Sequence, residues 1–202
     1  MDRCFVAYAA VFAAVLLPAE AIAATVSVDV RGSDGKPLAG AVIALDTPRK
    51  PAGPIKFDPP YEMAQQNIAF VPHVLIVPVG ATVTFPNRDK VRHHVYSFSK
   101  PRKFDLKLYG KDETRSVVFD KPGVVALGCN IHDAMNGYVV VVETPYAVQT
   151  DANGHATITG VPAGGATIRV WHPSIRAPDN MLVQSATIAP TGFATTYTIR
   201  GR

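Results

Sequence analysis

Short runs of β-branched residues recur along this chain, and most of them end at a glycine or a proline. The 202 residues include 15 Gly and 17 Pro. No long segment shows the 3.6-residue apolar period of an amphipathic helix. Short Val-, Thr- and Ile-rich segments between turn residues are typical of strands. Strands this short, at this turn spacing, indicate β-sandwiches, so we predict an all-β protein.

The first 24 residues have the composition of a secretory signal peptide. Arg3 supplies a positive start, residues 4–17 are apolar, and residues 21–23 form a small-x-small cleavage site. An uncleaved membrane anchor is the alternative, but the apolar run is short and Pro18 interrupts it. We therefore expect cleavage, a periplasmic or secreted protein, and no stable membrane insertion afterwards.

Cysteine usage follows from this cleavage. The precursor has two cysteines, and loss of Cys4 leaves Cys129 alone in the mature protein. A lone cysteine in an oxidising compartment has no partner for an internal disulfide. Cys129 is then either a buried, inert thiol or a metal ligand, and its neighbours favour the second interpretation.

Those neighbours form a regular spacing of soft and borderline metal ligands. Cys129, His132 and Met135 are each three residues apart, between the β-type runs 123–128 and 137–142. We expect Gly128 and Gly137, which bracket the ligands, to allow backbone angles that other residues resist. A thiolate, imidazoles and a weak thioether describe a blue-copper site, provided that a second histidine joins them.

The second histidine has five candidates in the mature chain. His73, His155 and His172 read as surface or strand-edge residues. His93 and His94 come just after the loop at residues 87–92, on the predicted strand 91–98, where a second ligand from the same end of a sandwich is expected. The residue pattern alone leaves both open, because a one-residue slip in register would exchange them.

The segments on either side of this unit have their own β patterns. Residues 25–46 read as a hairpin, and residues 47–60 contain five prolines that exclude a central strand. The turn motifs at 34–41 and 150–164 resemble the opening and middle of a carboxypeptidase regulatory-like (transthyretin-like) β-sandwich. That resemblance implies that residues 25–64 and 143–202 form one split domain, with residues 65–142 inserted in a surface loop.

Residues 65–142 resemble the cupredoxins. The pattern Cys129-x-x-His132-x-x-Met135-x-Gly137 is similar to that of the amicyanins, and the upstream segment 80–95 also matches. The resemblance implies a cupredoxin Greek-key β-sandwich beside a second, transthyretin-like or Ig-like β-sandwich. It also implies one type 1 copper, with His93, Cys129, His132 and Met135 as ligands. The whole arrangement looks like exported proteins labelled as methylamine-utilisation proteins.

The chain departs from the cupredoxin pattern at four positions. The family usually has Asn where this chain has His94, and often Ser or Thr where it has Asn130. We expect His94 and Asn130 to form a replacement hydrogen bond between the ligand loops. Asp133 and Ala134 replace a proline and a large apolar residue of amicyanin, so a partner borrowed from amicyanin does not follow.

Charge is concentrated around the candidate histidines. The formal net charge is +4, and it rises to +5 when cleavage removes Asp2, Arg3 and Glu20. The local cations are Arg88, Lys90, Arg92, Lys100, Arg102, Lys103 and Lys107. They predict either a basic patch near the copper that steers an acidic redox partner, or an ordinary solvated face. Export and the lack of interleaved aromatics disfavour nucleic acid.

These observations together predict an exported blue-copper protein that carries single electrons between periplasmic redox partners, such as a dehydrogenase or a c-type cytochrome. The alternative is a copper-binding or structural module of the cell envelope with no role as an electron carrier. An enzyme is disfavoured, because the remaining histidines are too scattered for further copper sites. Met135 would also close the position that a catalytic metal keeps open.

Overall fold

The computed structural model describes residues 23–49 and 53–200. Within these ranges the protein is all-β: sixteen strands and one short 3₁₀ helix, η1 (Pro178–Asn180), with no α-helix. No helix in the described part of the chain is long and apolar enough to cross a membrane. The predicted signal peptide lies outside the described residues except for its last two, because β1 begins at Ala23.

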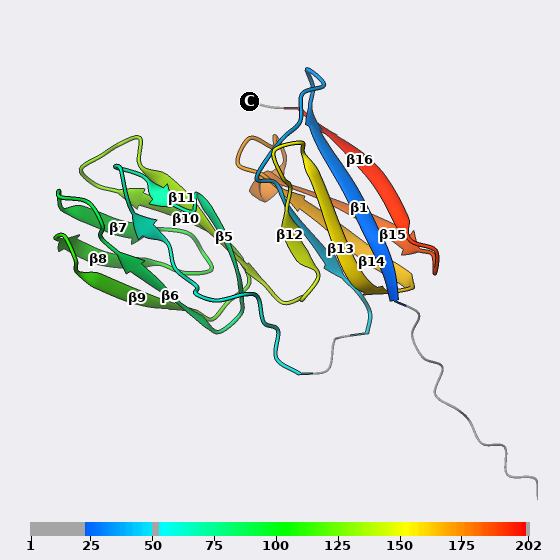
Figure 1. Cartoon of the computed structure of the whole chain (residues 1–202), viewed down its shortest axis with the longest axis horizontal. Helices are drawn as coiled ribbons and strands as arrows, with labels where there is room; N and C mark the ends of the chain where they lie inside the picture. The colour runs from blue at the N-terminus through cyan, green and yellow to red at the C-terminus, as the bar shows by residue number, and fades with distance from the viewer. Residues whose placement is uncertain (1–22, 50–52, 201–202) are drawn as a thin grey trace, which may run out of the picture.

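The strands gather into two lobes that lie side by side in Figure 1. The first lobe has a sheet of order β13-β1-β16 and a sheet of order β12-β2-β14-β15. Its strands are β1 (Ala23–Gly32), β2 (Val42–Asp46), β12 (Ala147–Gln149), β13 (His155–Pro162), β14 (Gly164–Trp171), β15 (Met181–Ile188) and β16 (Phe193–Ile199). These strands therefore come from both ends of the chain, and the second lobe from the residues between them.

The predicted hairpin over residues 25–46 is wrong. β1 pairs with β13 and with β16, whereas β2 pairs with β12 and β14, so the two strands lie in different sheets. Val28 of β1 and Ile43 of β2 are both fully buried in the same core cluster. Two strands can bury their apolar faces either as neighbours in one sheet or as members of two sheets that face each other. The alternation of apolar residues is the same in both cases, so it does not distinguish a hairpin from a sandwich.

The second lobe holds a five-stranded sheet of order β5-β11-β10-β7-β8 and the strand pairs β6-β9 and β3-β4. Its strands are β3 (Ala64–Gln65), β4 (Phe70–Val71), β5 (Val74–Pro78), β6 (Ala81–Pro86), β7 (His93–Ser97), β8 (Phe104–Tyr109), β9 (Thr114–Phe119), β10 (Gly123–Cys129) and β11 (Asn136–Val142). Alternating residues of β6, β7 and β10, such as Val83, Val95 and Val125, are fully buried in one core cluster.

A third apolar cluster joins the two lobes. It combines Val74, Val140 and Val142 of the five-stranded sheet with Val42 and Trp171 of the first lobe. Strands β2, β5 and β11 are apolar on both faces because one face packs into their own lobe and the other against the neighbouring lobe. The side-chain amide of Gln149 also donates to the backbone carbonyl of Val74, at 2.9 Å. The second lobe is thus held at β5 and β11, away from β7 and β8.

Candidate metal centre

The loop between β10 and β11 carries three of the predicted ligands. It is closed by two backbone hydrogen bonds, from the Met135 amide to the His132 carbonyl at 2.9 Å and from the Cys129 amide to the Met135 carbonyl at 3.3 Å. Strands β10 and β11 pair directly beneath it, from Gly128 opposite Asn136 downward. The loop is therefore short, internally bonded and anchored in the sheet at both ends.

The two glycines that bracket this loop have a different role from the predicted one. Neither Gly128 nor Gly137 has a positive φ. A Cβ on Gly137 would lie 2.9 Å from the Cβ of Phe70, and one on Gly128 would lie 2.8 Å from the hydroxyl of Tyr96. These positions need glycine because an aromatic side chain packs directly onto the backbone, rather than because of unusual backbone angles.

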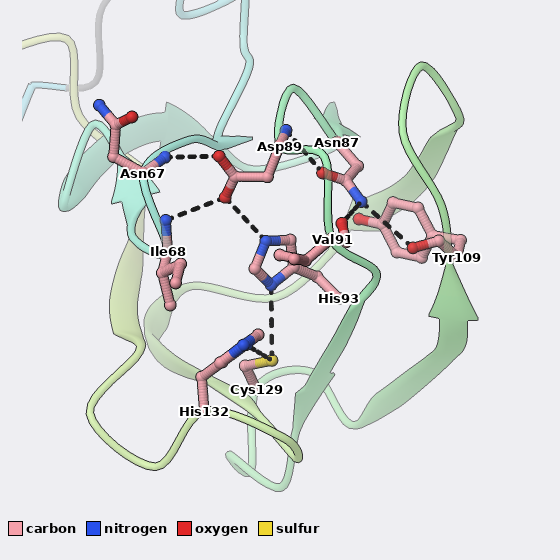
Figure 2. Close-up of polar contacts among 9 residues, drawn as sticks. All are labelled: Asn67, Ile68, Asn87, Asp89, Val91, His93, Tyr109, Cys129 and His132. Carbon is pink, nitrogen blue, oxygen red and sulfur yellow. Dashed lines mark hydrogen bonds and ion pairs between the residues drawn. The ribbon is translucent and has the colours of Figure 1, made fainter.

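His93 approaches the loop from β7, and three donor atoms converge. The Sγ of Cys129 lies 3.8 Å from Nδ1 of His93 and 3.6 Å from Nδ1 of His132. Donor atoms of these three residues all lie within 4.8 Å of one another. Figure 2 shows both imidazoles turned toward the sulfur. The structure thus brings together three of the four predicted ligands, from two separate parts of the chain.

The spacing of these atoms suits a metal between them. With metal–sulfur and metal–nitrogen bonds of about 2.3 and 2.05 Å, a trigonal site separates sulfur from nitrogen by about 3.8 Å. The observed separations of 3.8 and 3.6 Å are close to this value. His93 and Cys129 are buried and His132 is partly exposed. The donor set therefore fits a soft or borderline metal ion held in a mostly enclosed site with one exposed imidazole edge.

Met135 lies in the same buried cluster as Cys129 and is only 3% exposed. The backbone of Met135 forms hydrogen bonds with the backbones of Cys129 and His132, so its position in the loop is defined. A thioether this well enclosed is available to the site rather than to solvent. Its role as the fourth ligand stays a prediction.

A carboxylate on the far side of His93 determines how this imidazole faces the cluster. Oδ2 of Asp89 lies 2.8 Å from Nε2 of His93. An ionised carboxylate only accepts hydrogen bonds, so Nε2 carries the hydrogen and Nδ1 keeps its lone pair for a metal. Figure 2 shows the resulting line from Asp89 through His93 to Cys129. Sequence reasoning missed this role of Asp89, although its position four residues before His93 was visible.

Asp89 is itself held by a strained turn. Its Oδ1 accepts the amide of Asn67 at 2.7 Å, and its Oδ2 accepts the amide of Ile68 at 2.9 Å. Both donors have left-handed backbone angles, with φ of 57° and 55°, which an isoleucine adopts rarely. We therefore call Asp89, Asn67 and Ile68 the carboxylate clamp. Both donors therefore precede β4, which begins only at Phe70.

The clamp also sets the ionisation of its carboxyl. Burial raises the pKa of Asp89, but the hydrogen bonds from the Ile68 amide, from His93 and from the Asn67 amide outweigh it. The pKa of Asp89 is therefore below its ordinary value, and the carboxylate is charged at neutral pH. A fixed negative charge behind an imidazole makes it a better ligand for a more highly charged metal ion.

Asn87 braces the loop that carries Asp89. It is 1% exposed, and its side-chain amide donates to the carbonyls of Val91 and Tyr109 at 2.9 and 3.2 Å. Its carbonyl oxygen accepts the amide of Asp89 at 2.9 Å. The side chain of Asn87 therefore ties both sides of the loop together just before His93.

His94 lies on the opposite face of β7 from His93. Its Nε2 is 2.5 Å from Oδ1 of Asp105 on β8, and its ring lies 5.7 Å from that of Tyr96. No hydrogen bond between the side chains of His94 and Asn130 occurs in the described part of the chain, so that prediction is wrong. Alternation along the strand explains this, since neighbouring residues point to opposite faces.

The remaining histidines lie outside the cluster. His73 contacts the Asn136 side chain at 3.0 Å, His155 contacts Asp29 at 3.0 Å, and His172 contacts Ser174 at 2.6 Å. Burial, and then the charge of His73, lower the pKa of His172. In residues 23–49 and 53–200, the cluster of His93, Cys129 and His132 is the one group of metal-ligating side chains that converges in this way.

The predicted basic patch separates into two groups. Arg88, Lys90 and Arg92 precede β7 and lie beside the metal cluster, and Arg88 is paired with Glu62. Lys100, Arg102 and Lys103 follow the far end of the same strand, and Lys107 lies on β8. A five-residue strand spans roughly 17 Å, so one surface patch does not contain all seven cations.

No protein-family model and no curated protein matches this chain. Among solved structures, it is similar to a purple cupredoxin from Nitrosopumilus maritimus, with 26% identity over 41% of this chain and 100% of that chain, at a TM-score of 0.38.

It is also similar to an oxidised amicyanin variant, with 28% identity over 40% of this chain and 80% of that chain, at a TM-score of 0.37. A third similar structure is a copper-containing nitrite reductase from Thermus scotoductus, with 30% identity over 48% of this chain and 27% of that chain, at a TM-score of 0.41. These TM-scores lie below 0.5, so the proposals below depend on the chain's own residues. The transthyretin-like assignment and the predicted domain boundaries stay predictions.

Proposed function

We propose that this protein is an exported carrier of single electrons that binds one type 1 copper ion through His93, Cys129, His132 and Met135. The observation that carries the proposal is the convergence of one thiol sulfur and two Nδ1 atoms at separations of 3.6 and 3.8 Å. When bound at such a site, copper supplies a one-electron couple that needs neither substrate nor proton.

The protein's own contribution is to keep these donors in one geometry. The backbone-bonded loop positions Cys129 and His132, and the carboxylate clamp holds His93 with Nδ1 toward the sulfur. Little rearrangement is then needed when the metal changes oxidation state. The enclosed thiol is also protected from water and from oxidation, as a lone cysteine in an oxidising compartment requires.

His132 supplies the route to a redox partner. It is the partly exposed member of the cluster, and its neighbour Ile131 is 50% exposed. An exposed imidazole edge beside an apolar side chain favours brief contact with a protein partner, either a dehydrogenase or a c-type cytochrome.

The visible absorption spectrum tests the proposal. The mature protein loaded with Cu(II) should show an intense blue or purple thiolate-to-copper band, which ascorbate bleaches and reoxidation restores. Cys129→Ser should abolish the band. His93→Ala should abolish it as well, whereas His94→Ala, the matched change on the other face of β7, should leave it in place. A colourless wild-type complex, or no copper binding, would refute the proposal.

The second candidate is a copper-holding or structural module of the cell envelope. One specific observation favours it: the ligand loop is closed by backbone hydrogen bonds and its Cys129 and Met135 side chains are buried, so a metal there would stabilise the fold whether or not it changes oxidation state. Reversible voltammetry separates the two, since a structural site would not return its electron at potentials that periplasmic cytochromes reach. We propose no enzymatic activity, because Met135 would occupy the position that a substrate needs.

A further inference from the structure

The outer face of the five-stranded sheet is only half covered by the first lobe. Strands β5 and β11 face that lobe, and Val74, Val140 and Val142 belong to the apolar cluster between the lobes. Strands β7 and β8, at the other end of the sheet, have no residue in that cluster within the described ranges. Figure 1 shows β7 and β8 at the edge of the molecule, away from the other lobe.

A row of aromatic rings lies on this uncovered part. His94, Tyr96 and Phe98 alternate along β7 and just beyond it, so their side chains share one face. The ring centroids are 5.7 Å apart between His94 and Tyr96, and 5.2 Å apart between Tyr96 and Phe98. We call these three residues the aromatic row.

The end of the aromatic row is unusually open to solvent. Phe98 is 78% exposed, more than any other large hydrophobic residue in the described part of the chain. Leu108, which pairs with His94 across the β7–β8 ladder, is 41% exposed and adds apolar surface. A lone exposed apolar residue needs no explanation, but a row of rings in contact, with an apolar neighbour, is typical of a contact surface.

The aromatic row is directly connected to the metal centre. Tyr96 pairs with Gly128, and the next pair along the same ladder joins Val95 to Cys129. The phenol ring lies over the glycine so closely that a Cβ there would be 2.8 Å from the hydroxyl oxygen. Gly128 and Cys129 are consecutive, so a single peptide bond joins the residue that Tyr96 contacts to the thiol-bearing residue, and the row is a short covalent and hydrogen-bonded route from the surface to Cys129.

Cations follow Phe98 along the chain, in the segment between β7 and β8 and on β8 itself. Lys100 and Lys103 are exposed and form no ion pair within the described residues. Arg102 has only a loose contact with Asp120, at 3.8 Å, and Lys107 is paired with Asp105. The rim of the aromatic row therefore has a net positive charge. A second copy of this chain would bring the same cations to the same place, so charge disfavours self-association here.

We propose that the aromatic row and its cationic rim form a docking surface for an acidic redox protein, separate from the exposed edge of His132. The proposal rests on the proposed function, and it adds a second entrance for electrons. One electron leaves the reduced partner, and the Cu(II) centre gains it; no bond and no proton moves. Apolar contact with Phe98 supplies affinity, and the lysines supply steering and orientation.

Docking is measured first without depending on copper. Cytochrome b5, a small acidic haem protein, is titrated in its oxidised form into the full 15N-labelled chain, whether or not the chain has bound metal. Amide shifts should cluster on residues 94–104 and disappear with Phe98→Ala. Shifts confined to residues 129–135 would overturn the proposal, and so would shifts in no segment.

Electron transfer is then measured on the copper-loaded chain by stopped flow with reduced cytochrome b5. The double variant Lys100→Glu/Lys103→Glu should lower the second-order rate constant by about tenfold at low salt, with a smaller difference at high salt. Lys111→Glu, which reverses one charge in the β8–β9 turn where the double variant reverses two, should change it by less than about twofold. Hexaammineruthenium(II), a small cationic reductant, should react with all variants at similar rates if their copper sites are intact.

The outcomes separate the two proposals. A chain that binds no copper refutes the proposed function. The amide shifts caused by oxidised cytochrome b5 still show whether the aromatic row is a docking surface. Equal effects of the Lys100/Lys103 and Lys111 changes would refute docking at this face while the blue site stands. A wild-type dimer that Phe98→Ala converts to a monomer, seen by sedimentation, would assign the face to a second copy instead and overturn the proposal.

Discussion

The carboxylate of Asp89 should lower the reduction potential of a copper ion bound at His93. It contacts Nε2 at 2.8 Å, across the ring from the ligating nitrogen. With the ring and a metal–nitrogen bond of about 2 Å added, the charge lies roughly 7 Å from the metal. At an effective dielectric constant of about 20, the Coulomb interaction between the carboxylate and one unit of metal charge at this distance is about 2 kcal/mol.

Replacement of Asp89 by Asn removes this charge and keeps the shape of the side chain. The oxidised state loses more stabilisation than the reduced state, so the potential should rise. About 2 kcal/mol corresponds to roughly 90 mV for a one-electron couple. Protein-film voltammetry at pH 7 measures the shift, and the visible spectrum of the same sample checks that the blue site is intact.

Asp105→Asn is the matched control, because it removes the carboxylate from the histidine on the other face of β7. His94 is outside the donor cluster, so the potential should change by less than about 20 mV in 0.1 M salt. Asp89→Glu, which keeps the charge, should also remain near the wild type. An unchanged or lowered potential in a folded, blue Asp89→Asn protein would refute the electrostatic reasoning.

Asp89→Asn has a second consequence, for folding. Three donors, the amides of Asn67 and Ile68 and the His93 ring, point at this side chain. An amide offers one acceptor atom and adds two donors, so at least one of the three loses its partner. We expect the free energy of unfolding of the metal-free protein to fall by about 1–3 kcal/mol in urea titrations.

The pH dependence of Asp89 and two further substitutions provide additional tests. Because the folded pKa of Asp89 is lowered, its contribution to stability should be complete above about pH 4 and lost as the pH falls through the folded value, so unfolding midpoints of wild type and Asp89→Asn should converge in acid. Gly137→Ala should destabilise by about 1–3 kcal/mol, since its Cβ would meet Phe70 at 2.9 Å, whereas Gly165→Ala, with open space around it, should be nearly neutral in the same urea assay. Trp171→Ala should cost about 3–5 kcal/mol because this ring is 3% exposed between the lobes; a loss under 1 kcal/mol would contradict a packed interface.

The ligand loop was readable from the sequence because all of its information is local. Cys129, His132 and Met135 share one spacing, and the apolar runs on both sides predict paired strands, which β10 and β11 form. A loop this short between paired strands brings its donors together whatever else the chain does. The choice of His93 over His94 rested on a resemblance, since a pattern of two adjacent histidines does not say which one faces inward.

Predictions failed where a contact between distant segments was decisive. The clamp joins Asp89 to a turn about twenty residues earlier, and no local signal marks Asn67 and Ile68 as its donors. Gly128 and Gly137 were identified correctly as special positions but for the wrong reason, because only the structure shows the rings of Tyr96 and Phe70 on their backbones.

The amino-acid pattern alone predicted that the chain is all-β and which loop carries the soft metal ligands. These properties follow from period-two burial, turn residues and short-range spacing, which act over a few residues. Only the tertiary structure decided which strands pair, which face of β7 meets the thiol, and which carboxylate stands behind His93. These three features depend on how separate sheets pack. A strand's apolar face can be buried against many partners, and the sequence of the strand does not specify which one.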